Sequence, residues 1–354
     1  MPAPPGSLVR ARPPLTLGRY VIVLGLLAAL LAVAGYLSLG FGSADIAWRE
    51  MPSLLAGGGG AQDGIILRSI RLPRMLLAVL AGIALGAAGA TYQAVLRNPL
   101  AEPYILGVSG GAALGAIAVE TAGLGILGLG DAGIAGRPLG AFAGAALTIL
   151  FLFRVATLRG RAWSYSLILI GVVINSFFSA MILFIVTVAD FTRFQGVLFW
   201  LAGSLSAQPP AVLGLLAVVV GAGMLVLMGL GPALNLLSQG EATAGQLGLH
   251  VERARLVAVI VASLITAAVV SFAGLIGFVG LMIPHILRLA LGPDHRLLVP
   301  AAGLAGGLFL VVADTLARSV FAPTEIPVGI VTALCGGPFF IWLYRSRGGT
   351  SYFD

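Results

Sequence analysis

The sequence predicts an all-α protein that crosses a membrane about ten times. The chain of 354 residues is 59% hydrophobic and only 9% charged, against about 25% charged residues in an ordinary soluble domain. This composition excludes a soluble globular protein, and it excludes a disordered chain, which needs low hydrophobicity and high charge. Most charge-free intervals have a length close to the roughly 20 apolar residues that a spanning helix requires. The 50 glycines also indicate a membrane protein, because Gly lets membrane helices pack closely.

The spans follow from the positions of charged residues and prolines. Pro209 and Pro210 break a long apolar interval into a short interfacial helix ending near residue 205 and a sixth span. Residues 256–287 are too long for one crossing and too short for two, so a turn is expected at 271–274 and a total of nine or eleven spans stays open. The ten expected spans are 20–39, 75–96, 103–119, 138–153, 162–189, 211–230, 256–270, 276–291, 298–315 and 327–344.

Ten spans form a single transmembrane domain over residues 20–345, with tails at 1–19 and 346–354. Arginines are more frequent on the side of both tails, and the positive-inside rule therefore predicts that both termini are cytoplasmic. The arginines at 68–74 lie on the outer side and break this trend. A cleavable signal peptide is an alternative for the N-terminus, but the apolar run continues past the possible cleavage site at 32–34.

Residue types exclude several kinds of chemistry. All 20 basic residues are Arg, so the chain has no P-loop lysine and no Schiff-base lysine. The single cysteine, Cys335, excludes an intrachain disulfide and a Cys-based metal site. The three histidines match no metal-ligand spacing. We expect no catalytic residues, no metal and no cofactor, and no nucleic-acid partner despite the net charge of +7.

Several long motifs resemble one family of membrane proteins, in order and over nearly the whole chain from Ile65 to Arg345. They are RLPR at 71–74, Gly89, Gln93, RNPLAEPYILG at 97–107, GFVGL at 277–281, PHILR at 284–288, EIPVG at 325–329 and GPFF at 337–340. These motifs resemble the permease subunits of bacterial ABC importers for iron complexes and cobalamin.

The resemblance implies a type II ABC importer permease with about ten helices per subunit, in the bacterial inner membrane. It implies a second permease subunit, two ATP-binding cassette ATPase subunits and a periplasmic or lipid-anchored substrate-binding protein as partners, beside membrane lipids. The cargo implied is an iron(III)-siderophore or haem, with cobalamin as the alternative. Transport would proceed by alternating access, and ATP hydrolysis would belong to the separate ATPase.

The connection at 231–255 is the longest one expected in the cytoplasm. Pro232 and Gly240 predict the start and end of a short helix, and a second helix is expected from Glu241 to Gly248. Its leucines make it more apolar than a solvated loop, which indicates a covering partner. The resemblance implies coupling helices that contact the ATPase through Gly240, Glu241, Ala244, Leu247 and Gly248. The alternative is an amphipathic loop lying on the membrane.

Three arginines are expected at the outer surface. The resemblance implies that Arg71, Arg74 and Arg318 face outward and pair with glutamates of the binding protein. Arg suits this role because its planar fork binds carboxylates through two hydrogen bonds. The alternative is that the arginines extend to lipid headgroups.

Polar residues inside the apolar spans are candidates for the translocation path or for contacts between helices. Gln93 and Asn175 should face other helices or water, because unsatisfied polar groups are costly in lipid. Asn98 is expected to cap a rigid turn beside Pro99. Asp314 would suit an ion-coupled secondary transporter, but Arg318 lies one turn away, so an ion pair is expected instead.

Overall fold

The computed structural model describes residues 15–42, 46–58, 61–122, 133–156, 163–188 and 195–346, and the regular structure within these ranges is helical. The longer helices are α1 (Leu17–Gly40), α4 (Leu72–Val95), α5 (Val108–Thr121), α6 (Gly133–Ala156), α7 (Trp163–Val188), α9 (Pro210–Gly229), α12 (Val251–Ala273), α13 (Val279–Leu291), α14 (His295–Ser319) and α15 (Val328–Ser346). The shorter helices are α2 (Met51–Leu55), α3 (Ala61–Ile65), α8 (Gln195–Leu201), α10 (Gly231–Ser238), α11 (Glu241–Gln246), the π-helical η1 (Ile66–Arg71) and the 3-10 helix η2 (Pro103–Leu106).

Each of the ten expected spans corresponds to a helix, but three of these helices are short. Within the described ranges, seven helices are long and apolar enough to cross a membrane, and the third, eighth and tenth spans correspond to the shorter α5, α13 and α15. The backbone before α5 includes Gly107 at φ +78°, and α13 follows an irregular stretch that begins at Gly274, φ +69°. These breaks shorten the two helices, because a left-handed residue cannot continue an α-helix.

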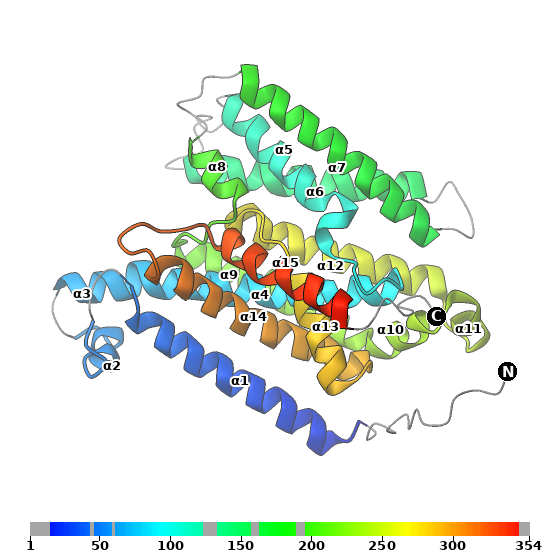
Figure 1. Ribbon diagram of the computed structural model, residues 1–354, viewed down its shortest axis with the longest axis horizontal. Coiled ribbons are helices and arrows are strands. Elements are labelled where there is room, and N and C mark those ends of the chain that lie inside the picture. Colours follow the sequence, from blue (N-terminus) through cyan, green and yellow to red (C-terminus); the bar gives the residue numbers. More distant parts are fainter. Residues whose placement is uncertain are drawn as a thin grey trace.

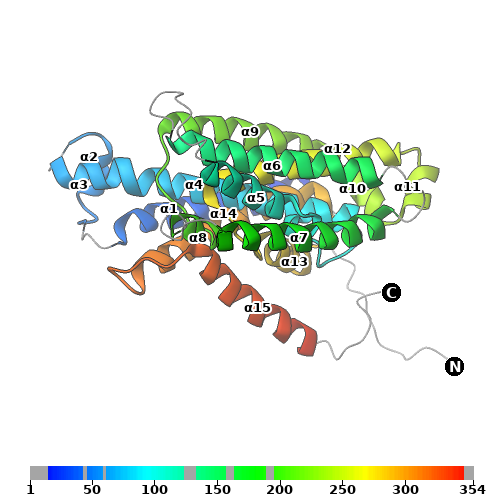
Figure 2. The ribbon, with the colours of Figure 1, turned by 90° about the horizontal axis from the view of Figure 1, so that it is seen from above.

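The helices form two layers. In Figure 1 the helices α5, α6 and α7 lie together above a body that contains α1, α4, α9, α12, α13 and α14. Figure 2 shows α15 diverging from this body. We call the end with α2 and α3 the outer end, and the end with α10 and α11 the inner end, after the orientation that the arginines predict.

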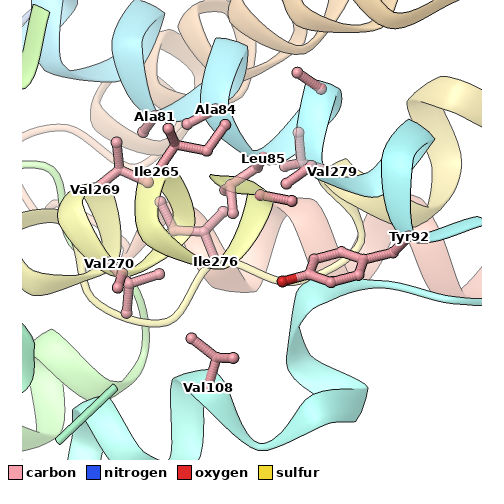
Figure 3. Packing of buried hydrophobic residues seen from close by; sticks show 14 of the residues in the cluster. Ala81, Ala84, Leu85, Tyr92, Val108, Ile265, Val269, Val270, Ile276 and Val279 are labelled. Atoms are coloured by element: carbon pink, nitrogen blue, oxygen red, sulfur yellow. The ribbon is translucent and has the colours of Figure 1, made fainter. Parts of the chain in front are cut away.

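Helix α4 lies in the centre of the body and packs most closely against α14. A Cβ atom on Gly86 would lie 2.1 Å from the carbonyl oxygen of Ala302, and one on Gly82 would lie 2.3 Å from that of Gly306. The two backbones are therefore in direct contact, which small residues permit between membrane helices. Figure 3 shows side chains of α4, α12 and the start of α13 meeting in the core. There the Tyr92 hydroxyl lies 2.5 Å from the Ser263 hydroxyl.

Candidate coupling, docking and pathway sites

Arg74 forms an ion-pair cluster at the outer end. Its guanidinium group binds both carboxylate oxygens of Asp314, at 2.9–3.1 Å, and donates to Glu325 at 2.6 Å. Arg318 approaches the same Asp314 at 3.6 Å, one helical turn away. The local ion pair expected between Asp314 and Arg318 is therefore present, and Arg74 completes it from α4. The Asp314 side chain is 2% exposed, whereas that of Glu325 is 57% exposed.

Arg71 and Arg318 cap the end of α1. The last carbonyl groups of a helix lack partners within it and favour positive charge. Arg71 donates to the carbonyl oxygens of Leu39 and Gly40, at 2.7 and 3.1 Å. Arg318 donates to the carbonyl oxygen of Phe41 at 2.8 Å and to the backbone and hydroxyl oxygens of Ser38.

Within the subunit, all three arginines are bound to groups of the same chain. Arg71 is 4% exposed and Arg318 is 6% exposed, and the Arg74 side chain is 12% exposed. They lie at the outer end, but their guanidinium groups are turned into the subunit rather than outward. The reason is physical: buried carbonyl and carboxylate oxygens need donors, and these arginines supply them. A partner could reach the cluster through Glu325.

The inner end carries the two helices expected in the coupling loop. Helix α11 begins after Gly240, whose φ is +116°, and is followed by Gly248 at φ +85°. Glu241 accepts a hydrogen bond from Arg255 of α12 at 2.9 Å. Ala244 is fully buried, while Leu247 is 64% exposed. Of the five expected coupling residues, Leu247 and Gly248 therefore lie on the free surface, and Gly240, Glu241 and Ala244 hold α11 in place.

Gln93 joins two helices within the body. Its side-chain amide donates to the carbonyl oxygens of Gly280 and Leu281, at 3.3 and 3.2 Å, and accepts from Arg288 at 2.5 Å. Gln93 was expected to face either another helix or water, and it faces another helix, α13. Asn98 caps the turn after α4, because its side-chain oxygen accepts from the backbone N–H of Leu100 at 2.9 Å.

Asn175 lies on a polar face of α7. Its side chain donates to the carbonyl oxygen of Tyr104 at 2.7 Å, and it lines an open hollow of about 630 Å³ together with Ser176 and Ser179. Both serines are exposed. Sequence reasoning missed them, although the polar spacing at 175, 176 and 179 on one helical face was a readable signal. No group of three or more metal-ligating side chains occurs among the described residues.

Glu102 is a half-buried carboxyl group that the sequence analysis did not single out. It lies between α4 and η2 and accepts a hydrogen bond from the backbone N–H of Phe278 at 3.3 Å. Phe278 has φ +68° and precedes α13. Burial raises the pKa of Glu102 from 4.5 to about 7, against the opposing effect of that hydrogen bond. Glu102 thus ties the connection before α5 to the start of α13.

The sequence pattern of the FecCD transport family matches residues 30–346, almost the whole helical body. The chain belongs to the FecCD transport family. It is a multi-pass membrane permease, and in this family ATP hydrolysis belongs to separate ATPase subunits. The family resemblance inferred from the motifs is thereby confirmed.

Relatives of this FecCD permease are named for different cargoes. It is 42% identical over 283 residues to the cobalamin import system permease protein BtuC of Halobacterium salinarum, covering 80% of this chain and 74% of that protein. It is 36% identical over 341 residues to the hemin transport system permease protein HmuU of Yersinia pestis, covering 94% and 96%. A solved inward-facing metal-chelate type ABC transporter superposes with a TM-score of 0.78 at 30% identity, covering 92% of this chain and 99% of that one.

Proposed function

We propose that this FecCD permease is the membrane subunit of an ATP-driven importer for a metal chelate, an iron(III)-siderophore or haem, in the bacterial inner membrane with both termini cytoplasmic. Cobalamin is the alternative cargo, because relatives of both kinds match the chain closely. The observation that carries the proposal is the exposed apolar Leu247 at the inner end, which is the C-cap of the short helix α11. This surface suits a separate ATPase, since the chain contains no lysine for a P-loop of its own.

The test uses the complex of permease, ATPase and binding protein. Cargo-loaded binding protein should stimulate ATP hydrolysis, and a panel of siderophores, haem and cobalamin identifies the cargo. Leu247→Asp should abolish the stimulation, because it places a carboxylate in the apolar contact. Gln239→Asp adds the same charge in the same loop outside α11 and serves as the control. Equal stimulation in both variants would mean that α11 lies on the membrane instead of on an ATPase.

A secondary transporter driven by protons or sodium is the other class of function. It would need an acidic residue free to exchange its ion near the middle of the membrane. The candidate from the sequence, Asp314, is instead bound by Arg74 and Arg318 near the end of α14. This arrangement supports the ATP-driven importer.

The outer end is proposed to bind the substrate-binding protein through Arg71, Arg74 and Arg318. Arg71 and Arg318 are buried, whereas Arg74 binds the exposed Glu325, so we assign the direct contact to Arg74 and a supporting role to Arg71 and Arg318. Glu325 is exposed and bound to Arg74 at 2.6 Å, so a carboxylate of the partner can take its place. Such charge pairs are screened by salt over a Debye length of about 8 Å at 0.15 M.

Replacing Glu325 tests this docking proposal without unfolding the cluster. Glu325→Gln removes the competing carboxylate and should tighten binding of the binding protein, with a steeper dependence on salt. Glu252→Gln removes one negative charge at the inner end, on an exposed residue, and should leave the affinity unchanged. If Glu325→Gln binds with unchanged affinity and salt dependence, docking does not use this cluster.

A second copy of the chain is proposed to pair with the surface of α7, enclosing a path for the cargo. Asn175, Ser176 and Ser179 line an open hollow on a spanning helix, and exposed amide and hydroxyl groups favour water over lipid. Water in a path between two subunits would satisfy these groups, and lipid would cover the apolar remainder. In a Cys335→Ser background, Ser176→Cys and Ser179→Cys should react with a charged thiol reagent, whereas Phe184→Cys on another face should not. Equal reaction at all three sites would contradict the path.

A further inference from the structure

Asn235 connects the coupling loop to the start of α14 through three hydrogen bonds. Its side-chain amide donates to Asp294 at 2.8 Å. Its side-chain oxygen accepts from the backbone N–H of His295 at 2.7 Å and lies 2.9 Å from Nδ1 of the same residue. Asp294 is the N-cap of α14. One amide on α10 therefore binds both the cap and the first residue of a spanning helix.

The packing around Asn235 keeps α10 beside α14. Leu234 and Leu237, on the same short helix, are 0% and 3% exposed. A Cβ atom on Gly231 would lie 3.0 Å from the Cα atom of Arg296, so the backbones of α10 and α14 nearly touch. Buried apolar groups and backbone contact hold α10 beside α14 but are not directional, so the hydrogen bonds of Asn235 are what fixes its position along α14.

Helix α11 is held far less firmly. In the described part of the loop, it is fastened by the ion pair of Glu241 with Arg255 and by the buried Ala244. Gly245 and Gly248 have open space around them. The surface proposed to meet the ATPase is thus on α11, whereas the firm attachment to the spanning helices is on α10.

The attachment continues to the outer end of the molecule. Helix α14 is in backbone contact with α4 at Gly82 and Gly86. At its other end, Asp314 of α14 binds Arg74 of α4. Helices α10, α14 and α4 are therefore linked at the inner end, in the middle and at the outer end, as a rigid unit.

We propose that Asn235 is a positioning residue that transmits motion of the coupling loop to α14 and α4, and through them to the outer docking surface. The inference rests on the proposed function. Only Gln239 and Gly240 separate α10 from α11, so a push on α11 is passed along the chain to α10, and the three hydrogen bonds of Asn235 oblige α14 to follow. Without them, the loop moves under ATP hydrolysis while the spanning helices lag behind.

The first test measures the amount of cargo transported per ATP hydrolysed by the complete complex in proteoliposomes. Asn235→Ala should lower this ratio by about tenfold, within the range typical of coupling between two sites, while ATP hydrolysis continues. Ser238→Ala is the matched control, because Ser238 lies on the same helix, is exposed and donates to the backbone carbonyl of Asn235, which does not take part in the three hydrogen bonds to Asp294 and His295. An Asn235→Ala complex with an unchanged ratio would overturn the proposal.

Exchanging the residue types at positions 235 and 294 distinguishes the loss of specific hydrogen bonds from a general structural defect. Asn235→Asp alone places two carboxylates together and should also lower the ratio. Asn235→Asp combined with Asp294→Asn removes the repulsion between the two carboxylates, keeps an oxygen at position 235 to accept from the N–H of His295 and keeps an N-cap at position 294, so the ratio should rise above that of Asn235→Asp alone. If the double variant transports no better than Asn235→Asp, the exchange of hydrogen bonds does not carry the coupling.

A distance measurement on the complex with Asn235 intact tests rigidity without relying on the variants. Spin labels at Ser238→Cys and Leu316→Cys, in one Cys335→Ser subunit of each complex, report the length from α10 to the outer part of α14. This distance should be the same without nucleotide and with ATP bound, and a change would contradict the rigid unit. Absence of any ATP-dependent transport by the unmodified complex would instead refute the proposed function.

Discussion

At the scale of single residues, the structure is governed by the need to satisfy buried charges. Asp314 is 1% exposed and is tolerated because Arg74 binds it with two nitrogens and Arg318 lies beside it. Removing one partner of a buried ion pair leaves the other charge uncompensated. Exposed pairs are screened by solvent and contribute little.

Asp314→Asn should therefore lower the free energy of unfolding by about 3–5 kcal/mol, the usual effect of breaking a buried pair. Glu325→Gln removes the exposed partner of the same Arg74 and should cost about 0–1 kcal/mol. Denaturant unfolding in detergent, followed by circular dichroism, measures both. Equal losses in the two variants would show that burial does not set the strength of this cluster.

Glu102 should make stability depend on pH. Its pKa is about 7 in the folded protein, above its ordinary value of 4.5, so the folded state binds the proton more tightly than the unfolded state. Its contribution is therefore favourable at low pH and is lost as pH rises from about 4.5 to 7. Thermal unfolding at pH 5 and pH 8 should show a larger decrease for the unmodified protein than for Glu102→Gln. Parallel curves would contradict the shifted pKa.

Sequence reasoning at this scale found the residues but not all of their partners. The pairing of Arg318 with Asp314, four residues away, was expected, but Arg74 also binds Asp314, 240 positions away, and Arg318 also binds Ser38, 280 positions away. A local motif carries no information on such contacts. Asn98 was predictable, because its capping partner is two residues away.

At the scale of elements, glycine spacing sets how closely helices approach. The contact of α4 with α14 depends on Gly86, where an added Cβ would meet the backbone of Ala302 at 2.1 Å. A backbone atom cannot move aside as a flexible side chain can. By contrast, Gly221 in α9 has no atom within 4 Å of an added Cβ.

Gly86→Ala should therefore destabilise the protein by about 1–3 kcal/mol or more, as overpacking does. Gly221→Ala should leave stability unchanged or raise it by about 0.5–1 kcal/mol, since Ala is the better helix former. The midpoint of thermal unfolding in detergent compares the two. If Gly86→Ala unfolds no earlier than Gly221→Ala, the helices are not in backbone contact at this position.

Charge-free intervals predicted where the helices lie, because the membrane imposes one length on a spanning helix. The intervals could not predict that α5 and α13 begin after the first residues of the expected spans. Phe278 adopts φ +68° beside the Glu102 carboxylate, a contact between distant segments. The expected turn at 271–274 was close to the observed end of α12 at Ala273.

At the scale of the whole molecule, the two ends of the body are connected by α4 and α14 (Figure 1). The inner end presents Leu247 on a loosely held α11, and the outer end presents Glu325 on a buried charge cluster. An ATPase and a binding protein on opposite sides of the membrane could exchange mechanical work through this body. The account therefore depends on ATP as the source of energy.

Cargo uptake into proteoliposomes tests that dependence most directly. The complex of permease, ATPase and binding protein should accumulate its chelate when ATP is supplied to the side of the coupling loop, with no proton or sodium gradient. The permease alone should accumulate none under either gradient. Gradient-driven accumulation by the permease alone, without the ATPase, would contradict the account.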